Sequence, residues 1–368
     1  MSTFVLMAGG TGGHLFPAMA LAQELRRRGH VIHLMTDERV ASYGDDFPAQ
    51  AVHIVPSATP SIRNPFKLLL AGLKIGQGTA VAWGKLGAIK PDAVVGFGGY
   101  PTVPPFLGGR LRGVRGAVHD ANAIVGRANH LLARYADVLA LSFDHTARIE
   151  GFERKVVVTG NPVRDSVRLA AGTPYPVIED GAPLHVLVFG GSQGARAFGE
   201  LVPPAVALLP QSLRSRLRIT QQCRPEDLDR VAEIYRQAKV NVELAAFFTD
   251  LPERMAQSHL VISRSGASTV AELCVIGRPA LLIPLPGAID GDQKNNALVL
   301  DRAGGGWIAE QSGLTPAILA KRLEALLAAP GTLWKAAGIA RSLGKPDAVA
   351  RLADLAEKLA AGKAAGNA

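Results

Sequence analysis

The sequence is short of cysteine and of aromatic residues. Its two cysteines, Cys223 and Cys274, form no C-x-x-C pair, so the sequence offers neither a zinc-ligand motif nor a redox motif. We expect both to be reduced thiols of a cytosolic protein. Aromatic residues make up 5% of the chain, too few to build the base-stacking platforms of a protein that binds single-stranded nucleic acid.

Segments that direct a protein to or across a membrane are also missing from the sequence. No stretch approaches the ~20 apolar residues that a membrane-spanning helix requires. The first residues run directly into glycines, without the basic start or the small-residue cleavage site of a signal peptide. The sequence therefore predicts a protein that is made and kept in the cytoplasm.

Positive charge, by contrast, is in excess. The 368 residues carry a formal net charge of +9, with 40 Lys and Arg against 31 Asp and Glu. Such an excess favours an anionic partner, which can be nucleic acid, an anionic membrane surface or a phosphorylated ligand. No DNA- or RNA-binding motif is present, so we expect no nucleic acid and retain the other two.

Each half of the chain begins with the same pattern, a short apolar strand followed by a glycine-rich loop and a helical segment. The two loops are residues 9–14 (GGTGGH) and residues 190–196 (GGSQGAR). Further short apolar runs follow, as expected for strands of a parallel sheet that helices cover on both faces. The pattern predicts an α/β fold with two Rossmann-like, doubly wound parallel-sheet domains that face a cleft.

The expected boundary between the domains lies at the turn Gly160-Asn161-Pro162 and the loose, proline-rich stretch that follows it. We expect the first domain over residues 1–162 and the second over residues 163–344. A further helix is expected over about residues 345–360. Its packing back on the first domain is compatible with the sequence.

A glycine-rich turn between a strand and a helix presents backbone N–H groups where phosphate charge is favoured. Neither loop is the G-x-G-x-x-G fingerprint of dinucleotide-binding proteins, and neither contains the G-K-[S/T] of a P-loop. Residues 190–194 do fit G-x-S-x-G, the nucleophile elbow of α/β-hydrolases. The partners available downstream, Asp250 and His259, are only nine residues apart. We therefore interpret Ser192 as a phosphate ligand instead.

Several motifs together are similar to those of one family. They occur in order over nearly the whole chain, at residues 9–14, 98–100 (GGY), 160–164 (GNPVR), 190–196 and 263–272 (SRSGASTVAE). In this set the chain resembles the MurG family of N-acetylglucosaminyltransferases, which has the GT-B fold. The resemblance implies inverting transfer of N-acetylglucosamine from UDP-N-acetylglucosamine (UDP-GlcNAc) to undecaprenyl-pyrophosphoryl-MurNAc-pentapeptide (lipid I). This reaction forms the β-1,4 linkage of lipid II in peptidoglycan synthesis.

Two alternatives to this function stay open. One is another GT-B glycosyltransferase with a different acceptor, and the other is a non-catalytic protein that binds nucleotide sugars. The resemblance implies no cofactor and no metal ion, because glycine loops and helix N-termini stabilise the UDP leaving group in this family. Asp290 and Asp292 have the D-x-D spacing of metal-dependent glycosyltransferases, but their surroundings favour a solvated turn.

The resemblance places the donor in the second domain. Ser192 is expected to contact a phosphate, and Arg164 to lie near the same site. Phe248 falls where the backbone of family members binds uracil. Glu272 is expected to accept hydrogen bonds from the ribose hydroxyls, and Gln293 to bond the hydroxyls of the sugar. The helix N-terminus beneath the diphosphate is expected to consist of Ala267, Ser268, Thr269, Val270 and Ala271.

The acceptor is expected at the first glycine loop, and the candidate general base there is His14. A histidine beside backbone dipoles has a pKa range suited to neutral pH. The alternative is a histidine at the start of a helix that binds pyrophosphate or caps the loop. Thr11, Gly12 and Gly13 are expected to shape the pocket for the acceptor pyrophosphate and the transferred sugar.

Asn122 is the remaining expected ligand, and the resemblance places it against the donor sugar. It ends the stretch His119-Asp120-Ala121-Asn122, where family members have His-Glu-Gln-Asn. His119 and Asn122 are retained, whereas positions 120 and 121 depart from the pattern. The resemblance therefore assigns no role to these two residues.

A lipid-linked acceptor implies docking on the anionic inner membrane, at its cytoplasmic face. The segment 64–85 contains several large apolar residues together with Lys67, Lys74 and Lys85, which share one helical face. A basic amphipathic helix of this kind is typical of interfacial binding. Periodicity alone is equally compatible with an ordinary packed helix. The basic residues Arg110, Arg112 and Arg115 are candidates for the same surface.

Overall fold

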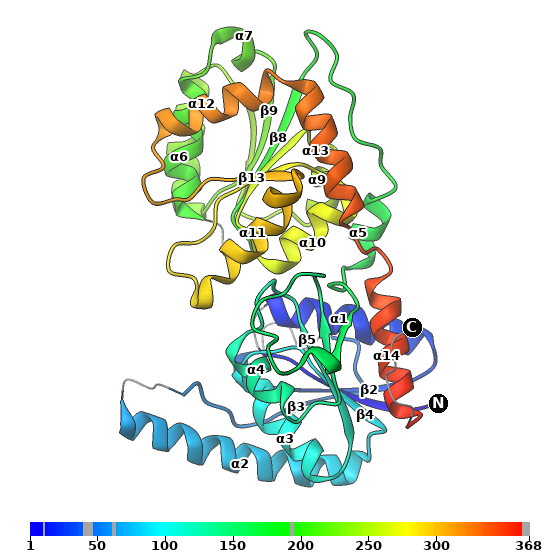
Figure 1. The fold of residues 1–368 in the computed structure, drawn as a ribbon. Coiled ribbons are helices and arrows are strands. Elements are labelled where there is room, and N and C mark those ends of the chain that lie inside the picture. The colour runs from blue at the N-terminus through cyan, green and yellow to red at the C-terminus, as the bar shows by residue number, and fades with distance from the viewer. Residues whose placement is uncertain (10–11, 40–46, 61–63, 192–194, 363–368) are drawn as a thin grey trace. The chain divides into compact units, whose positions relative to one another are not determined.

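The computed structural model describes residues 1–9, 12–39, 47–60, 64–191 and 195–362. The chain forms two compact units. Unit 1 comprises Met1–Arg164 and Lys345–Ala368, and unit 2 comprises Asp165–Gly344. Each is a parallel sheet covered by helices (Figure 1). The expected α/β class with two doubly wound parallel sheets, the arrangement of the GT-B fold, is confirmed.

Unit 1 contains a seven-stranded sheet with the order β3-β2-β1-β4-β5-β6-β7, in which every pair of neighbours is parallel. Its strands are β1 (Thr3–Met7), β2 (Val31–Thr36), β3 (Ala51–Ile54), β4 (Ala93–Gly96), β5 (Arg115–Asp120), β6 (Val138–Leu141) and β7 (Val156–Val158). Its helices are α1 (Gly12–Arg27), α2 (Pro65–Ile89), α3 (Val103–Leu111), α4 (Arg127–Ala133) and α14 (Ala348–Ala360).

Alternate residues of each central strand in unit 1 face different helices, because side chains alternate between the two faces of a strand. Phe4 and Leu6 of β1 pack with α1 and α14. Val5 and Met7 of the same strand pack with α2, α3 and α4. The near-continuous apolar runs of the sequence thus belong to strands that are buried on both faces.

Helix α14 belongs to unit 1 although its sequence follows unit 2. Its apolar face joins the core that α1 covers. At its edge the Arg28 guanidinium donates to Asp354 Oδ1 at 2.6 Å and to Glu357 Oε2 at 2.8 Å. Nε2 of His30 lies 2.8 Å from Glu357 Oε1. Burial and these partly exposed charge pairs together hold α14 against the start of the chain.

Unit 2 contains a six-stranded parallel sheet with the order β10-β9-β8-β11-β12-β13. Its strands are β8 (Leu184–Phe189), β9 (Leu217–Gln222), β10 (Asn241–Ala245), β11 (Leu260–Ser263), β12 (Ala280–Leu282) and β13 (Gly306–Ile308). Its helices are α5 (Asp165–Ala170), α6 (Arg196–Ala207), α7 (Gln211–Arg214), α8 (Leu228–Gln237), α9 (Leu251–Ala256), α10 (Ala267–Ile276), α11 (Asp292–Ala303), α12 (Pro316–Leu327) and α13 (Pro330–Ser342).

Both sheets have a point at which the strand order reverses. In unit 1 the chain proceeds outward from β1 to β2 and β3, and then resumes on the other side of β1 with β4. In unit 2 the corresponding neighbours are β8 and β11. The loops at the carboxyl ends of such a pair diverge, and ligands of open α/β sheets bind there.

No helix of the described residues combines the length and the apolar character needed to cross a membrane.

Candidate active site

His14 lies at the strand-order reversal of unit 1, in the first turn of α1 and therefore just after β1. The loop that follows β4 passes beside it. A Cβ atom on Gly98 would lie 3.1 Å from Cδ2 and 3.2 Å from Nε2 of His14, and one on Gly99 would lie 3.5 Å from Nδ1. Both glycines have positive φ, +96° and +76°. The loop thus needs glycine for its backbone conformation and for its contact with the imidazole.

The loops after β1 and β4 are also joined by their backbones. The amide of Gly9 donates to the carbonyl oxygen of Gly98 at 3.2 Å. The same oxygen accepts from the Thr102 hydroxyl at 2.7 Å. The glycine motif at 98–100 is therefore part of the His14 site. Gly12 and Gly13 begin α1 beside it, whereas Thr11 lies outside the described residues.

The surroundings of His14 keep its imidazole neutral at neutral pH. Its burial lowers the pKa, the positive charge of Arg39 lowers it further, and together they bring it to about 4. A neutral imidazole has a lone pair that can accept a proton. The site therefore holds its histidine in the protonation state that a general base requires.

A buried polar network lies at the neighbouring strand end, where β5 finishes. His119 is fully buried, and its Nε2 donates to the carbonyl oxygen of Gly160 at 3.1 Å. Because Nε2 carries the proton, Nδ1 is left as an acceptor. Burial lowers the pKa of His119 to about 4 and the charge of His14 contributes, although the bond to Gly160 opposes this shift. The two histidines are thus electrostatic neighbours.

Asp120, the next residue, is one to which the family resemblance assigns no role. Its buried carboxylate accepts from the backbone amides of Asn122 at 3.0 Å and Gly126 at 2.8 Å, and from Nδ2 of Asn129 at 2.9 Å. Burial raises the pKa of Asp120 against the effect of these bonds. Asp120 therefore fixes the loop that carries Asn122, a role that sequence reasoning missed. The short spacing from Asp120 to the Asn122 amide, typical of an Asx turn, was the available signal.

In unit 2 the strand-order reversal contains the N-terminus of α10. Gly266 is the N-cap residue and provides no side-chain cap, and Ala267 to Ala271 form the first turns. The first N–H groups of a helix have no partner inside the helix. Ser268 Oγ is buried without a hydrogen-bond partner among the described residues. Together with the buried Glu272, these groups form a site suited to an anion with hydroxyl groups beside it.

Gln293 lies beside this helix terminus. Its carbonyl oxygen accepts from the Ser265 hydroxyl at 2.7 Å, and its side-chain Oε1 accepts from the Leu285 amide at 2.9 Å. Asn296 Nδ2 donates to the carbonyl oxygen of Ser265 at 3.1 Å. The loop before α11 is thus fixed to the loop before α10. The side-chain amide NH2 of Gln293 is the group that can donate to a ligand.

Two further expected residues have partners of their own. Phe248 is buried, and the Arg254 guanidinium lies over its ring at 4.4 Å from the centroid. The neighbouring Phe247 is instead 64% exposed, a difference that the sequence could not reveal. Arg164 ends the first segment of unit 1, and its guanidinium lies 5.1 Å from the centroid of Phe16 in α1.

The remaining expectations concern Ser192 and metal ligands. Ser192 lies outside the described residues. Asp292 Oδ1 accepts from the Gln293 amide at 2.8 Å at the start of α11. Within the described ranges, no three or more His, Cys, Asp or Glu side chains form a group that could hold a metal ion.

Replacing Gly98 by alanine should destabilise unit 1 more than a positive φ alone explains. Gly113 is the matched control, because its φ is +73° and no atom lies within 4 Å of its Cβ position. We expect Gly113→Ala to cost roughly 1 kcal/mol and Gly98→Ala roughly 2–4 kcal/mol, since the latter also displaces Asn129 and His14. Hydrogen exchange of the β1 and β4 amides measures both. Equal costs would show that the contacts of Gly98 with Asn129 and His14 do not constrain the loop.

Titration of His14 followed by NMR should have its midpoint near pH 4 rather than near the usual 6.5. Because the folded pKa is the lower one, neutral His14 stabilises the fold fully above pH 6.5, and this contribution is lost as the pH falls toward 4. Arg39→Ala should raise the His14 midpoint, because it removes the positive charge that lowers the His14 pKa. A His14 midpoint near 6.5 in the unsubstituted protein would contradict the described surroundings.

Comparison with known proteins identifies the family. Residues 4–140 match the glycosyltransferase family 28 N-terminal domain, and residues 185–352 match the family 28 C-terminal domain. Two relatives carry the name UDP-N-acetylglucosamine--N-acetylmuramyl-(pentapeptide) pyrophosphoryl-undecaprenol N-acetylglucosamine transferase. The one from Allorhizobium ampelinum is 49% identical over 98% of this chain and 96% of its own length. The one from Methylobacterium sp. (strain 4-46) is 52% identical over 95% of each chain.

A solved structure agrees with these relatives. The crystal structure of MurG from Acinetobacter baumannii is similar with a TM-score of 0.79 and 30% sequence identity, over 97% of this chain and 99% of that one. The resemblance inferred from the motifs is thereby confirmed. The chain belongs to glycosyltransferase family 28 and, within it, to the MurG family of UDP-N-acetylglucosamine--N-acetylmuramyl-(pentapeptide) pyrophosphoryl-undecaprenol N-acetylglucosamine transferases.

Proposed function

We propose that the protein transfers N-acetylglucosamine from UDP-GlcNAc to lipid I, with inversion at the anomeric carbon, and thereby forms lipid II for peptidoglycan synthesis. The observation that carries this function is about 50% identity over nearly the whole chain to transferases named for this donor and this acceptor. The protein is thus a glycosyltransferase of cell-wall synthesis. We also propose a role for each of the expected site residues.

His14 is proposed as the group that removes the proton from the acceptor. The acceptor hydroxyl oxygen forms a bond to C1 of the sugar, the bond from C1 to the UDP oxygen breaks, and the hydroxyl proton moves to the imidazole. The neutral state of His14 supports this role. A pKa of about 4 makes a weak base, but the negative charge of an acceptor pyrophosphate beside the imidazole would raise it. Thr11, Gly12 and Gly13 would shape the pocket for that pyrophosphate.

Unit 2 is proposed to bind the donor. The first turns of α10, from Ala267 to Ala271 with Ser268, Thr269 and Val270 between them, would receive the diphosphate, because unpartnered N–H groups and the helix dipole stabilise a departing UDP. Ser192 would contact the same phosphates. Glu272 would accept hydrogen bonds from the ribose hydroxyls.

The sugar and the base of the donor are assigned to four further residues. Gln293 and Asn122 would bond the hydroxyls of the sugar. The backbone at Phe248 would bind uracil, which agrees with a ring that Arg254 already covers. Arg164 would approach the phosphates. A catalytic cleft formed by both units stays a prediction from the family resemblance.

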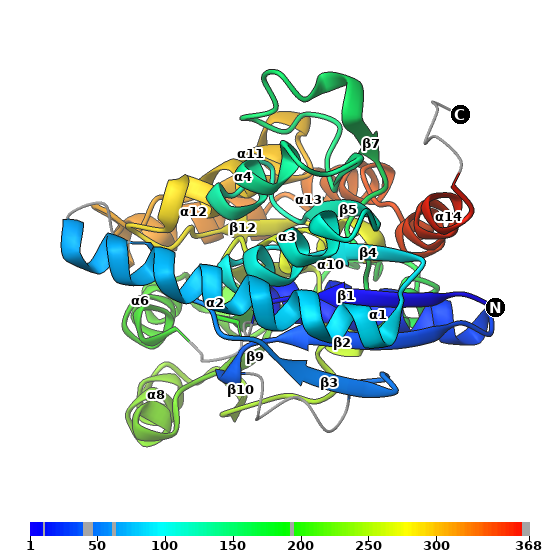
Figure 2. The same cartoon turned by 90° about the horizontal axis from the view of Figure 1, so that it is seen from below.

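Docking on the cytoplasmic face of the inner membrane is proposed for the N-terminal half of α2. Phe66, Leu69 and Leu73 are 67%, 61% and 63% exposed, and Lys67 and Lys74 are exposed among them. Figure 2 shows these turns extending past α3. Exposed apolar side chains between lysines suit an anionic interface. Of the two interpretations of this segment, the packed helix describes the second half, where Ala82 and Leu86 are buried.

The three arginines expected on the membrane surface have different surroundings. The Arg112 guanidinium lies 4.0 Å from the centroid of Trp83 in α2 and donates to the Trp83 carbonyl oxygen. Arg110 pairs with Asp137. Arg110 and Arg115 line a separate hollow. Only Arg112 is therefore assigned to the surface of α2.

The proposed reaction is tested by transfer of labelled N-acetylglucosamine from UDP-GlcNAc to a lipid I analogue in the presence of EDTA. We expect a β-linked product from the unsubstituted protein. His14→Ala should lower kcat by about 10²–10⁴-fold and leave the donor affinity within about twofold, because a base acts only in the transition state. His33→Ala, on strand β2, is the control and should retain activity.

The outcomes separate the reaction from the role of His14. Absence of transfer by the unsubstituted protein, with UDP-GlcNAc binding intact, would move the function to another acceptor. Equal losses of kcat and donor affinity in His14→Ala would exclude the general base and favour the pyrophosphate-binding alternative.

The proposed membrane contact is tested by sedimentation with vesicles of phosphatidylcholine and phosphatidylglycerol. We expect the double variant Leu69→Glu/Leu73→Glu to bind vesicles at least about tenfold more weakly. It removes apolar area that enters the membrane on binding, and it adds negative charge that an anionic surface repels. Leu169→Glu/Leu208→Glu is the matched control, since both leucines are exposed in unit 2. Vesicle binding that does not depend on salt or on phosphatidylglycerol content would contradict a membrane contact at α2. An equal loss of binding in the control variant would contradict it too.

A further inference from the structure

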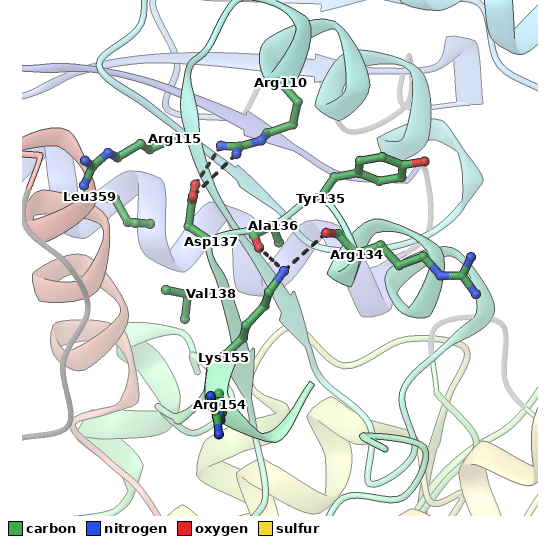
Figure 3. Close-up of a pocket in the computed structure, with 10 residues that line it drawn as sticks. All are labelled: Arg110, Arg115, Arg134, Tyr135, Ala136, Asp137, Val138, Arg154, Lys155 and Leu359. Carbon is green, nitrogen blue, oxygen red and sulfur yellow. Dashed lines mark hydrogen bonds and ion pairs between the residues drawn. The ribbon is translucent and has the colours of Figure 1, made fainter. Parts of the chain in front are cut away.

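Unit 1 has a second cluster of charged side chains at the opposite edge of its sheet from His14. A hollow of about 530 Å³ lies there (Figure 3). Strands β5 and β6 begin at this edge, whereas His14 and the glycine loops follow the carboxyl ends of β1 and β4. The residues that line the hollow are Arg110, Arg115, Arg134, Tyr135, Ala136, Asp137, Val138, Arg154, Lys155 and Leu359.

Two of the cations around the hollow are held by the fold. The Arg110 guanidinium donates to Asp137 Oδ2 at 2.7 Å and Oδ1 at 3.4 Å. Asp137 Oδ2 also accepts from the Gly116 amide at 2.8 Å. The Lys155 ammonium donates to the carbonyl oxygens of residues 133, 134 and 136 at 3.0, 3.2 and 2.8 Å, and thereby caps the end of α4. The carboxylate of the hollow is thus already engaged, and Lys155 has no carboxylate among these partners.

The other three cations are Arg115, Arg134 and Arg154. None of their three guanidinium groups forms a hydrogen bond or an ion pair that involves the described residues. They belong to three elements: the start of β5, the end of α4 and the 3₁₀ turn η4 (Glu153–Lys155). Figure 3 shows them on three sides of the hollow. Five cations therefore surround a space with one paired carboxylate.

Such an arrangement raises the electrostatic potential in the hollow and favours a bound anion. Guanidinium groups match the oxygen atoms of a phosphate in pairs, which an ammonium group cannot do. The phenol of Tyr135 at the rim adds a neutral donor. The cations surround one hollow rather than follow a groove, which suits a compact ion with several charges better than an extended acidic peptide.

We propose that this hollow binds a phosphate-bearing ligand of about the size of a diphosphate, through Arg115, Arg134 and Arg154, at a site separate from the transfer reaction. Arg110 and Lys155 supply fixed positive charge beneath it. The hollow recognises its ligand through a phosphate group with accessible oxygen atoms. A free diphosphate in solution and the headgroup of an anionic lipid both carry such a group.

Calorimetric titration of the full chain with inorganic pyrophosphate, in the presence of saturating UDP, tests the site. We expect Arg115→Ala/Arg134→Ala/Arg154→Ala to weaken binding at least about tenfold. Arg302→Ala/Lys321→Ala/Lys335→Ala removes the same number of charges from exposed positions in unit 2 and should leave the affinity within about twofold. His14→Ala should retain the binding, because His14 lies at the other edge of the sheet.

Sedimentation with phosphatidylglycerol vesicles distinguishes the source of the phosphate. If the unsubstituted chain does not bind pyrophosphate, a tenfold loss of vesicle binding confined to the Arg115/Arg134/Arg154 variant identifies a lipid headgroup. Equal losses of binding in both triple variants would show that binding depends only on the net charge of the protein, and would overturn the proposal. So would unchanged binding of both probes in the arginine variant. Retained transfer activity shows that the triple arginine variant is folded. The single variant Arg154→Ala is a milder test, and its affinity for the ligand should fall about threefold.

Discussion

The order of strands in each parallel sheet is the constraint on which both sites depend. When a sheet grows outward in both directions from two central strands, the loops that follow those strands diverge and leave room for a ligand. Strands β1 and β4 are such a pair in unit 1, and β8 and β11 are such a pair in unit 2. His14 and Gly98 are far apart in the sequence, and they come into contact only because β1 and β4 are neighbours.

The electrostatics of unit 1 differ between the two edges of its sheet. At the carboxyl edge, burial keeps His14 and His119 neutral, and a buried carboxylate is used to fix a loop. At the amino edge, guanidinium groups gather around a hollow. Part of the positive net charge that the sequence shows is therefore concentrated at one edge of unit 1, with further lysines on α2. A histidine must be unprotonated to accept a proton as a general base, whereas binding of anions is favoured by fixed positive charge.

Much of the fold was predictable from the sequence, because its signals are local. Apolar strands that run into glycine loops predicted two doubly wound sheets, and the motifs that occur in order along the chain predicted the family. What could not be predicted depends on contacts between distant segments. The bond of Arg28 to Glu357 joins positions 329 residues apart, and it helps to place α14 on unit 1. Likewise, the periodicity of α2 cannot show that its first half is exposed while its second half packs on α3.

The candidate site was predictable in outline for the same reason. His14, Gly98 and the start of α10 were identified from motifs, and each lies at a strand-order reversal. Asp120 was missed, because its role depends on burial and on three donors that only the folded loop brings together. The exposure of Phe247 and the burial of Phe248 also depend on packing, since the two phenylalanines are identical in sequence terms.

Amide hydrogen exchange of the full chain, with and without UDP-GlcNAc, tests most directly the claim that the β8–β11 edge of unit 2 holds the donor. We expect slower exchange over residues 264–272 and over the loop that leads into α11, with little change at the amino edge of unit 1. Protection confined to the His14 loop and residues 98–100, with none at the start of α10, would contradict it.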